Sequence, residues 1–152
     1  MQIIAPFLWF DNQAEEASKF YLSIFKNSKL LSVMKGPDGK VMGTTFQLES
    51  QAFMTLNGGP LFKFTEAVSF FVGCDSQKEV NYFWNKLTEN SGEPGRCGWL
   101  KDKYGLSWQI IPTAMTKMLN DSDPKKAKRV FDAMMKMSKI DIETLKQAYT
   151  GK

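Results

Sequence analysis

The chain has 152 residues, enough for one domain with a buried core, and it is rich in aromatic side chains, with 12 phenylalanines and 4 tryptophans. No apolar run approaches the roughly 20 residues that a membrane-spanning helix needs. The net charge of +4 is modest, and many lysines of the last third have spacings typical of solvated helix faces. Basic residues are not interleaved with exposed aromatics, so we expect neither a membrane protein nor a nucleic-acid-binding protein.

The number of cysteines and the N-terminal residues indicate the cellular compartment of the protein. Cys74 and Cys97 could form at most one disulfide, and "MQIIAPFLWF" has no basic segment before its apolar stretch, as a signal peptide would. We therefore expect two reduced thiols and a cytoplasmic protein. No glycine-rich turn follows a strand as a nucleotide-like cofactor would require, and we expect no cofactor.

Two helices of similar design are predicted. In residues 11–25 apolar side chains recur at helical spacing, and Asn12 with Glu15 can form a capping box. In residues 75–87 Ser76 and Glu79 form the same box. The two helices match at a constant offset, which pairs Glu16, Ala17, Phe20, Tyr21 and Ile24 with Glu79, Val80, Phe83, Trp84 and Leu87.

Each helix is preceded by an apolar strand and followed by further strands. After the second helix the chain predicts a hairpin, Cys97–Lys101 and Leu106–Ile111, on which Trp108 and Gln109 point to opposite faces. The repeat predicts two supersecondary units that pack together. We expect one α+β domain, residues 1–152, with paired βαβββ modules at 1–60 and 64–112. An ordinary α+β domain with coincidental similarity is the alternative.

The tail, residues 113–152, is predicted to be a helical extension. Asp123 and Pro124 start one helix, and Gly151 ends a shorter one. The residues that follow one face of the first helix are Ala127, Val130, Phe131, Met134 and Ser138. The apolar side of the second helix consists of Ile142, Leu145 and Tyr149. Apolar tail faces and unpaired outer strands together predict a homodimer.

The paired plan resembles the vicinal oxygen chelate superfamily, which includes glyoxalase, bleomycin-resistance proteins and extradiol dioxygenases. Within it the chain is similar to the PhnB-like branch, often labelled 3-demethylubiquinone-9 3-methyltransferase. The matching stretches are "PFLWFDNQAEEASKFYLSIFKNSK", "LNGGPLFKFTEAVSFFV", "CGWLKDKYGLSWQIIP" and "KRVFDAMMKMSKIDIETLKQAYTG". The resemblance implies a curved mixed sheet of the glyoxalase/bleomycin-resistance fold and a homodimer.

The superfamily's metal ligands lie on four strands and face the inside of the curved sheet. The resemblance places these positions at Ala5, Thr55 (or Asn57 after a slip of two), Ser69 and Gln109. A divalent metal that polarises substrate oxygens needs imidazole and carboxylate ligands, at least three of them from the protein. The chain has no histidine, and alanine has no lone pair, so we expect that the metal site has been lost.

Side-chain alternation along the strands predicts the other residues of the cavity. Cys97, Trp99 and Lys101 share one face of their strand, and they join the cavity if that face is the inner one. The candidate ligand-binding residues are Phe7, Trp9, Thr55, Asn57, Ser69, Phe71, Cys97, Trp99, Lys101 and Gln109. An aromatic hollow with a few polar groups is typical of a small-molecule pocket, but the same aromatics could instead close the sheet as core.

Three functions are compatible with this pattern. We favour a metal-independent protein that binds a small aromatic or planar molecule. The second is a metal-independent enzyme related to the methyltransferase-like family, in which Lys101, Cys97 or Glu66 supplies acid–base or nucleophilic chemistry; without histidine it has no Cys–His or Ser–His pair. A glyoxalase-type metalloenzyme is the least favoured, because its ligands are missing.

Overall fold

The computed structural model describes residues 4–152. The chain divides into two units, Met1–Phe64 and Thr65–Lys152. The first contains β1 (Phe7–Phe10), α1 (Ala14–Ile24), β2 (Ser28–Lys35), β3 (Val41–Leu48) and β4 (Gln51–Asn57). The second contains β5 (Ser69–Cys74), α2 (Gln77–Thr88), β6 (Glu93–Pro94), β7 (Trp99–Lys101), β8 (Ser107–Pro112), α3 (Thr113–Leu119), α4 (Pro124–Met134) and α5 (Ile142–Thr150).

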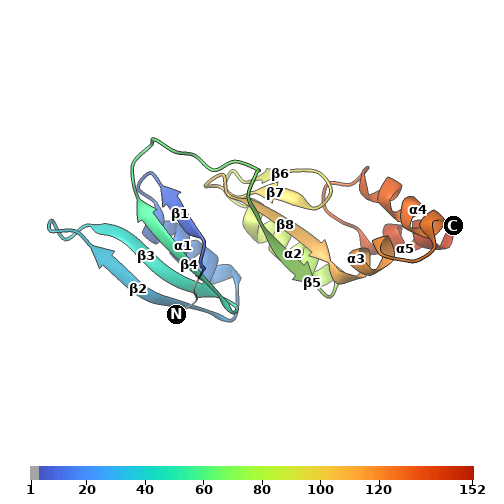
Figure 1. The fold of residues 1–152 in the computed structure, drawn as a ribbon, viewed down its shortest axis with the longest axis horizontal. Coiled ribbons are helices and arrows are strands. Elements are labelled where there is room, and N and C mark those ends of the chain that lie inside the picture. Colours follow the sequence, from blue (N-terminus) through green and yellow to red (C-terminus); the bar gives the residue numbers. More distant parts are fainter. Residues whose placement is uncertain (1–3) are drawn as a thin grey trace. The chain divides into compact units, whose positions relative to one another are not determined.

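The sheets of the two units have the same topology. Their strand orders are β1-β4-β3-β2 and β5-β8-β7-β6. In each sheet the first strand runs parallel to the last, and the remaining pairs are antiparallel. One helix packs on each sheet, α1 in the first unit and α2 in the second (Figure 1). The predicted α+β class and the paired βαβββ modules are therefore confirmed.

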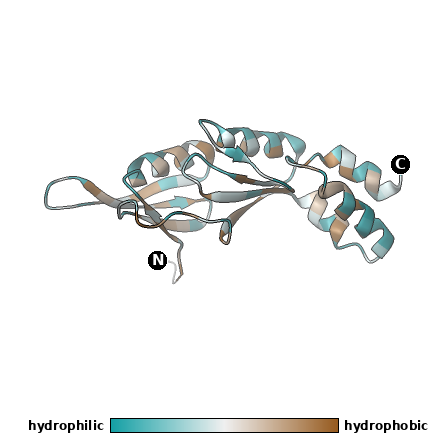
Figure 2. Ribbon diagram, turned by 90° about the horizontal axis from the view of Figure 1, so that it is seen from above, coloured by the Kyte–Doolittle hydropathy of each residue, from teal (hydrophilic) through white to brown (hydrophobic). Residues whose placement is uncertain are grey.

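Each helix packs on its sheet through buried side chains at positions that the repeat pairs between the two helices. Both are amphipathic, with hydrophobic and hydrophilic residues interleaved along the ribbon (Figure 2). Burying one large apolar side chain stabilises the fold by about 1.5–3 kcal/mol, so a few such residues suffice to hold a helix on its sheet. The matched pairs that are buried on both helices are Ala17 and Val80, Tyr21 and Trp84, and Ile24 and Leu87.

The N-terminus of α2 is capped as predicted. Ser76 Oγ accepts a hydrogen bond from the backbone N–H of Glu79 at 3.2 Å. The Glu79 carboxylate in turn accepts from the backbone N–H of Asp75 at 2.6 Å. This reciprocal pair satisfies two N–H groups that the helix itself leaves free.

The predicted capping box of α1 is wrong. Instead of Asn12, the side chain of Asn57 on β4 caps this helix, since its Oδ1 accepts from the N–H of Ala14 at 2.8 Å. The Asn57 amide also donates to the Val41 carbonyl at 3.0 Å. A cap supplied by a distant strand leaves no signal in the local sequence of the helix.

The tail helices share one apolar cluster. As predicted, α4 starts at Asp123, whose carboxylate accepts from the N–H of Lys125 at 2.9 Å, and α5 ends at Gly151, where φ is +79°. Phe131 on the apolar face of α4 is 49% exposed, so this face is only partly covered. The cluster consists of Ile111, Met115, Val130, Ile140 and Leu145.

Two general expectations concern the thiols and the membrane. Cys74 and Cys97 are both free, as predicted. Burial raises the pKa of the Cys74 thiol to about 12, so this cysteine is unreactive at neutral pH. Within residues 4–152, every helix is too short or too polar to cross a membrane.

Candidate functional site

The second sheet has one face under α2 and one open face. Leu100, Trp108 and Ile110 are at most 2% exposed and lie on the α2 side. Neighbouring residues of a strand point to opposite faces. The strand register therefore places on the other side a set that we call the open face: Ser69, Phe71, Trp99, Lys101, Ser107 and Gln109.

The predicted separation of Trp108 and Gln109 is confirmed. The indole N–H of Trp108 donates to Asp102 Oδ2 at 2.9 Å in the core. The Gln109 amide lies on the open face and donates to Ser69 Oγ at 2.9 Å. Two of the four positions that the resemblance equates with metal ligands are therefore in contact, but they are bonded to each other.

The aromatic side chains of the open face lie on either side of Gln109. The register pairs Gln109 with Phe71 on β5 and with Trp99 on β7. Phe71 is 60% exposed, and Trp99 is partly exposed. Among the sequence-predicted residues, the structure thus brings together Ser69, Phe71, Trp99, Lys101 and Gln109.

Lys101 is held by two carboxylates. Its Nζ lies 2.7 Å from Glu66 Oε1 and 3.7 Å from Glu93 Oε2. The hydrogen bond between Lys101 and Glu66 raises the pKa of the lysine and lowers the pKa of the carboxyl. Lys101 is therefore a cation at neutral pH and has no amine lone pair for nucleophilic attack, although an ammonium group can donate three hydrogen bonds.

A hollow of about 290 Å³ lies beside this ion pair. Its size is close to the lower limit for small-molecule pockets, roughly 300 Å³. We call it the Ser107 hollow, and its lining consists of Glu66, Glu93, Pro94, Gly95, Arg96, Trp99, Leu100, Lys101 and Ser107.

The Ser107 hydroxyl is the unusual group of this hollow. Ser107 is 0% exposed, and its Oγ has no hydrogen-bond partner among residues 4–152. A buried hydroxyl without a partner costs about 1–3 kcal/mol, so such groups are rare in folded proteins. Side-chain alternation along the strand predicts that Ser107 faces the same side as Gln109, but the candidate ligand-binding residues drawn from the sequence do not include it.

The expectation that Cys97 shares a face with Trp99 and Lys101 is wrong. Strand β7 begins only at Trp99, and Cys97 lies in the preceding turn with a φ of +56°. Its N–H donates to the Met137 carbonyl at 2.9 Å, and its Sγ lies 3.8 Å from the sulfur of Met135. The thiol therefore faces the tail.

The expectation that Thr55 and Asn57 share a face with Phe7 and Trp9 is also wrong. The parallel register pairs Phe7 with Met54, and Trp9 with Leu56. Parallel partners point to the same side, so Thr55 and Asn57 belong to the opposite side, toward α1. Thr55 is 3% exposed and its hydroxyl lies 2.6 Å from that of Thr44. A one-residue error in register moves every side chain of a strand to the other face.

The Trp9 side chain contacts other residues of the first unit. Its indole N–H donates to the Gly59 carbonyl at 2.9 Å, and the ring of Phe62 meets it edge-on at 5.0 Å between centroids. A Cβ on Gly58 would lie 2.3 Å from the Trp9 ring, so only glycine permits this approach. Phe7, 55% exposed, is the open aromatic side chain of this strand.

The residues present do not fit the metal that the superfamily resemblance implies. Ala5 has no donor atom, and Ser69 and Gln109 are neutral groups that bond each other. In the described part of the chain, no three His, Cys, Asp or Glu side chains lie close enough together to hold a metal ion. Neutral hydroxyl and amide oxygens alone do not make a catalytic divalent site.

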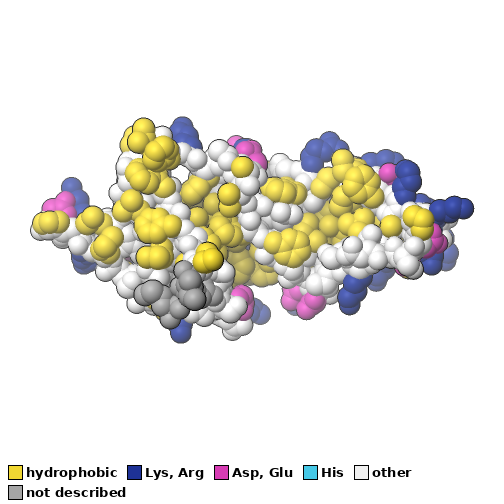
Figure 3. Space-filling view, viewed as in Figure 1, with side chains coloured by type: hydrophobic (Ala, Val, Ile, Leu, Met, Phe, Trp, Pro, Cys, Tyr) yellow, Lys and Arg dark blue, Asp and Glu magenta, His cyan; other side chains and the backbone are white. Residues whose placement is uncertain are grey.

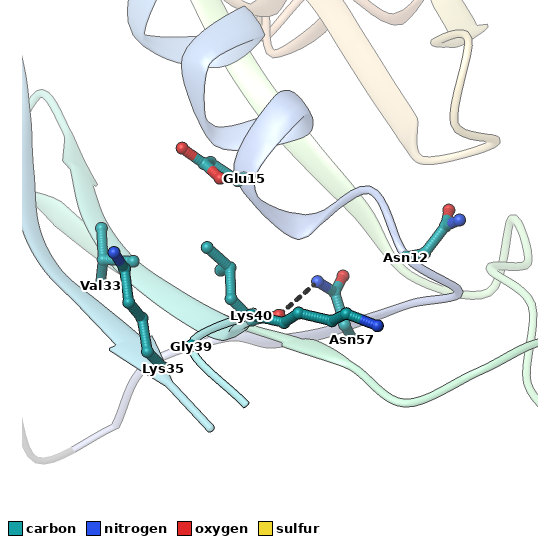
Figure 4. A pocket seen from close by; sticks show the side chains of 8 residues that line it. Asn12, Glu15, Val33, Lys35, Gly39, Lys40 and Asn57 are labelled. Atoms are coloured by element: carbon teal, nitrogen blue, oxygen red, sulfur yellow. Dashed lines mark hydrogen bonds between the residues drawn. The ribbon is translucent and has the colours of Figure 1, made fainter. Parts of the chain in front are cut away.

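A larger hollow, of about 870 Å³, lies in the first unit between the start of α1 and the β2–β3 hairpin. Figure 4 shows the amino groups of Lys35 and Lys40 pointing apart, and the Asn57 amide bonded to the Val41 carbonyl. Glu15 is paired with a lysine of its own helix at 2.8 Å. The lining of this hollow contains no aromatic side chain, and the side chains of Glu15 and Asn57 already have partners. We therefore place the candidate site in the Ser107 hollow.

The class of the protein follows from the repeated unit. Two mixed sheets of identical topology, each covered by one helix, form the glyoxalase/bleomycin-resistance fold. The chain is similar to protein PA1353 from Pseudomonas aeruginosa, with a TM-score of 0.61 and 19% identity over 74% of this chain and 98% of that one. It is also similar to the fosfomycin resistance protein FosX from Listeria monocytogenes, with a TM-score of 0.51 and 13% identity over 74% and 93%. At these identities only the fold is shared.

Residues 2–111 match the family model described as 3-demethylubiquinone-9 3-methyltransferase. The PhnB protein from Bacillus cereus is 34% identical, with a TM-score of 0.68, over 74% of this chain and 100% of that chain. The chain therefore belongs to the PhnB-like 3-demethylubiquinone-9 3-methyltransferase family. A comparison with the curated proteins finds no match. Helices α3, α4 and α5 lie outside the segment that matches the family.

Proposed function

We propose that this protein binds a small planar molecule with a ring-borne oxygen in the Ser107 hollow, without a metal ion. The observation that carries the proposal is the buried Ser107 hydroxyl, which has no hydrogen-bond partner in residues 4–152. A ligand that displaces the atoms covering this hydroxyl and supplies its hydrogen-bond partner recovers the free energy that the unbound protein forgoes. A polar group at the base of an aromatic hollow is also the usual way in which pockets orient a ligand.

The aromatic lining favours a flat ligand. Trp99 lies in the wall of the hollow, and Phe71 stands on the same face. Stacking of a ring on an aromatic side chain contributes about 0.5–1.5 kcal/mol beyond the area that it buries. At about 290 Å³ the hollow suits a ligand of one or two rings.

The polar lining favours an acceptor oxygen on that ring. Ser107 and Lys101 are direct partners across β7 and β8, so their side chains lie about 4.5–5.5 Å apart at Cβ. The hydroxyl and the remaining ammonium hydrogen can both donate to one carbonyl or phenolic oxygen. The two lining carboxylates balance Lys101 and Arg96, so a neutral ligand fits better than an anion. The family description names a demethylubiquinone, a ring with oxygens of this kind, which supports the same class.

A fluorescence titration tests the proposal. Duroquinone is a suitable probe because it is planar, carries two carbonyl oxygens and has no ring carbon open to thiols. We expect saturable quenching of indole emission that a chelator does not change, and most of the quenching should disappear in Trp99→Phe. Quenching that requires added metal would contradict the proposal, as would a non-saturable response to duroquinone and to flat aromatic antibiotics.

The ion pair at the hollow predicts a flat pH profile. The pair is complete above the ordinary glutamate pKa of 4.5 and is lost only as the pH falls through the lowered pKa of Glu66. At the alkaline end it is complete below 10.5 and is lost only as the pH rises through the raised pKa of Lys101. Duroquinone affinity should therefore change by less than about twofold from about pH 5 to about pH 9. A titration midpoint at the ordinary value of either group, 4.5 for the glutamate or 10.5 for the lysine, would show that the pair does not form.

We also propose that the chain forms a homodimer through the edge of the first sheet. Strand β2 is an edge strand, and Figure 3 shows hydrophobic side chains gathered on the surface of this unit. Exposed apolar edge strands favour association, and a two-fold pair is the commonest closed assembly. The exposed apolar side chains of β2 are Leu30, Leu31, Val33 and Met34.

Light scattering at micromolar concentration tests the dimer. The wild type should have the mass of two chains, and Leu31→Lys should shift it toward one. Leu61→Lys is the matched control, because Leu61 is 74% exposed but lies outside β2. A wild type that stays monomeric would contradict this proposal, and so would equal effects of the two substitutions.

A further inference from the structure

The turn before β7, residues 95–98, forms part of the Ser107 hollow. Gly95 and Arg96 line the hollow, and the turn leads directly into Trp99. Its last two residues, Cys97 and Gly98, both have left-handed backbone conformations, with φ values of +56° and +84°. A residue other than glycine rarely adopts this conformation, so the contacts that hold Cys97 in it also shape the hollow.

The tail supplies those contacts. The N–H groups of Cys97 and Gly98 donate to the carbonyls of Met137 and Ser138 at 2.9 and 2.8 Å. In the other direction, the Ser138 hydroxyl donates to the Gly95 carbonyl. Figure 1 shows the turn between β6 and β7 beside the segment that joins α4 to α5. Both residues of the turn that have a positive φ, Cys97 and Gly98, are therefore hydrogen-bonded to the tail.

Arg96 connects the wall of the hollow directly to the tail. Arg96 lines the hollow, and its guanidinium donates to the Met135 carbonyl at 2.6 Å. Movement of the end of α4 would therefore displace a side chain that a bound ligand meets.

The same tail segment is clamped from its other side by α2. The Gln77 side-chain amide donates to the Ile140 carbonyl at 3.0 Å, and its oxygen accepts from the N–H of Ile142 at 2.8 Å. Ile140 is 0% exposed in the tail cluster. Gln77 does not line the hollow, so it can be changed without touching a ligand.

We propose that docking of the C-terminal helices onto residues 95–98 controls the affinity of the Ser107 hollow. This inference rests on the proposed function and assigns a role to a segment that lies outside the family match. The docked tail holds the turn in the conformation that completes the hollow. Ligand binding and tail docking then favour each other, and because such coupling is reciprocal, a bound ligand must also hold the tail in place.

The test uses Gln77→Ala in the full chain, with two readouts. Affinity for duroquinone is measured by calorimetry, and release of the turn by the rate at which iodoacetamide alkylates Cys97. Cys74 does not interfere, since it is buried and its thiol pKa is raised to about 12. Tyr149→Phe is the control: it removes the bond from the Tyr149 hydroxyl to Asp121 within the tail and leaves the turn alone.

We expect Gln77→Ala to weaken duroquinone binding by about tenfold and to speed alkylation by a similar factor. Saturating duroquinone should slow alkylation of Cys97 in the wild type. Tyr149→Phe should change either quantity by less than about twofold. If Gln77 only stabilises the fold, Gln77→Ala should lower the melting temperature, but duroquinone affinity and the alkylation rate of Cys97 should not change together.

Three other outcomes would overturn the coupling. Faster alkylation in Gln77→Ala with wild-type affinity would show that the tail holds the turn but not the hollow. No change in either readout would show that the clamp does not hold the turn. A wild type that does not bind duroquinone overturns the proposed function and the coupling together, whereas unchanged binding by Gln77→Ala overturns the coupling alone.

Discussion

Replacing Ser107 by alanine is expected to stabilise the protein and to weaken ligand binding at the same time. The substitution removes a buried hydroxyl that has no partner in the described chain, a group that costs about 1–3 kcal/mol. The melting temperature should rise by about 2–4 °C for each kcal/mol recovered. Duroquinone, in contrast, loses one hydrogen bond, and its affinity should fall by about threefold to tenfold.

Ser69→Ala is the matched control for this experiment. Ser69 stands on the same face, but its hydroxyl accepts a hydrogen bond from Gln109 at 2.9 Å. Loss of the Ser69 hydroxyl should lower the melting temperature slightly, because a hydrogen bond is broken and no unpaired buried group is removed. Thermal unfolding and calorimetry give both quantities. If Ser107→Ala destabilises the protein as Ser69→Ala does, the Ser107 hydroxyl has an ordinary structural role.

Gly98→Ala is expected to be among the most destabilising single-methyl changes in the chain. A Cβ at this position would lie 2.7 Å from Cδ1 of Ile111, 2.9 Å from the Ile110 carbonyl and 3.2 Å from Cγ1 of Ile140. The φ of +84° adds a conformational penalty. The two effects together should reduce the free energy of unfolding by about 3 kcal/mol or more.

Gly105→Ala separates these two effects. Gly105 has the same φ of +84°, but a Cβ there would meet nothing within 4 Å. This variant should lose only the conformational part, about 1–2 kcal/mol. Urea denaturation of both variants measures the difference. Equal losses would show that the space around Gly98 can adjust and that the turn is not tightly held.

The sequence predicts the faces of the second sheet better than those of the first, because the main signal for the second sheet lies within a single strand. In the second unit Trp108 and Gln109 are neighbours on one short strand, and their alternation predicts which residues lie on each face of the sheet. The position of Ser69 then follows from the helix repeat. The alternation of Trp108 and Gln109 lies within the strand whose faces it predicts, and no distant part of the chain overrides it.

The errors share a dependence on distant contacts. The face of Thr55 depends on the register of β4 against β1, which pairs it with Leu8. The cap of α1 comes from β4, and the direction of Cys97 comes from bonds to the tail. Helix α3 has no local start signal, since Pro112 at its N-cap offers no side-chain acceptor. The determinants of the Thr55 face, the α1 cap and the Cys97 direction all lie far away in the sequence.

Chemical-shift mapping with duroquinone on isotope-labelled protein tests the central claim most directly, because it reports where on the chain a ligand binds. The account predicts saturable shifts at the backbone amides of Lys101 and Ser107 and at the indole N–H of Trp99. The same titration of Ser107→Ala should need a higher ligand concentration to produce them. Shifts centred instead on Asn12, Lys35 and Lys40 around the first-unit hollow would contradict the assignment of the site, and so would a spectrum that duroquinone leaves unchanged.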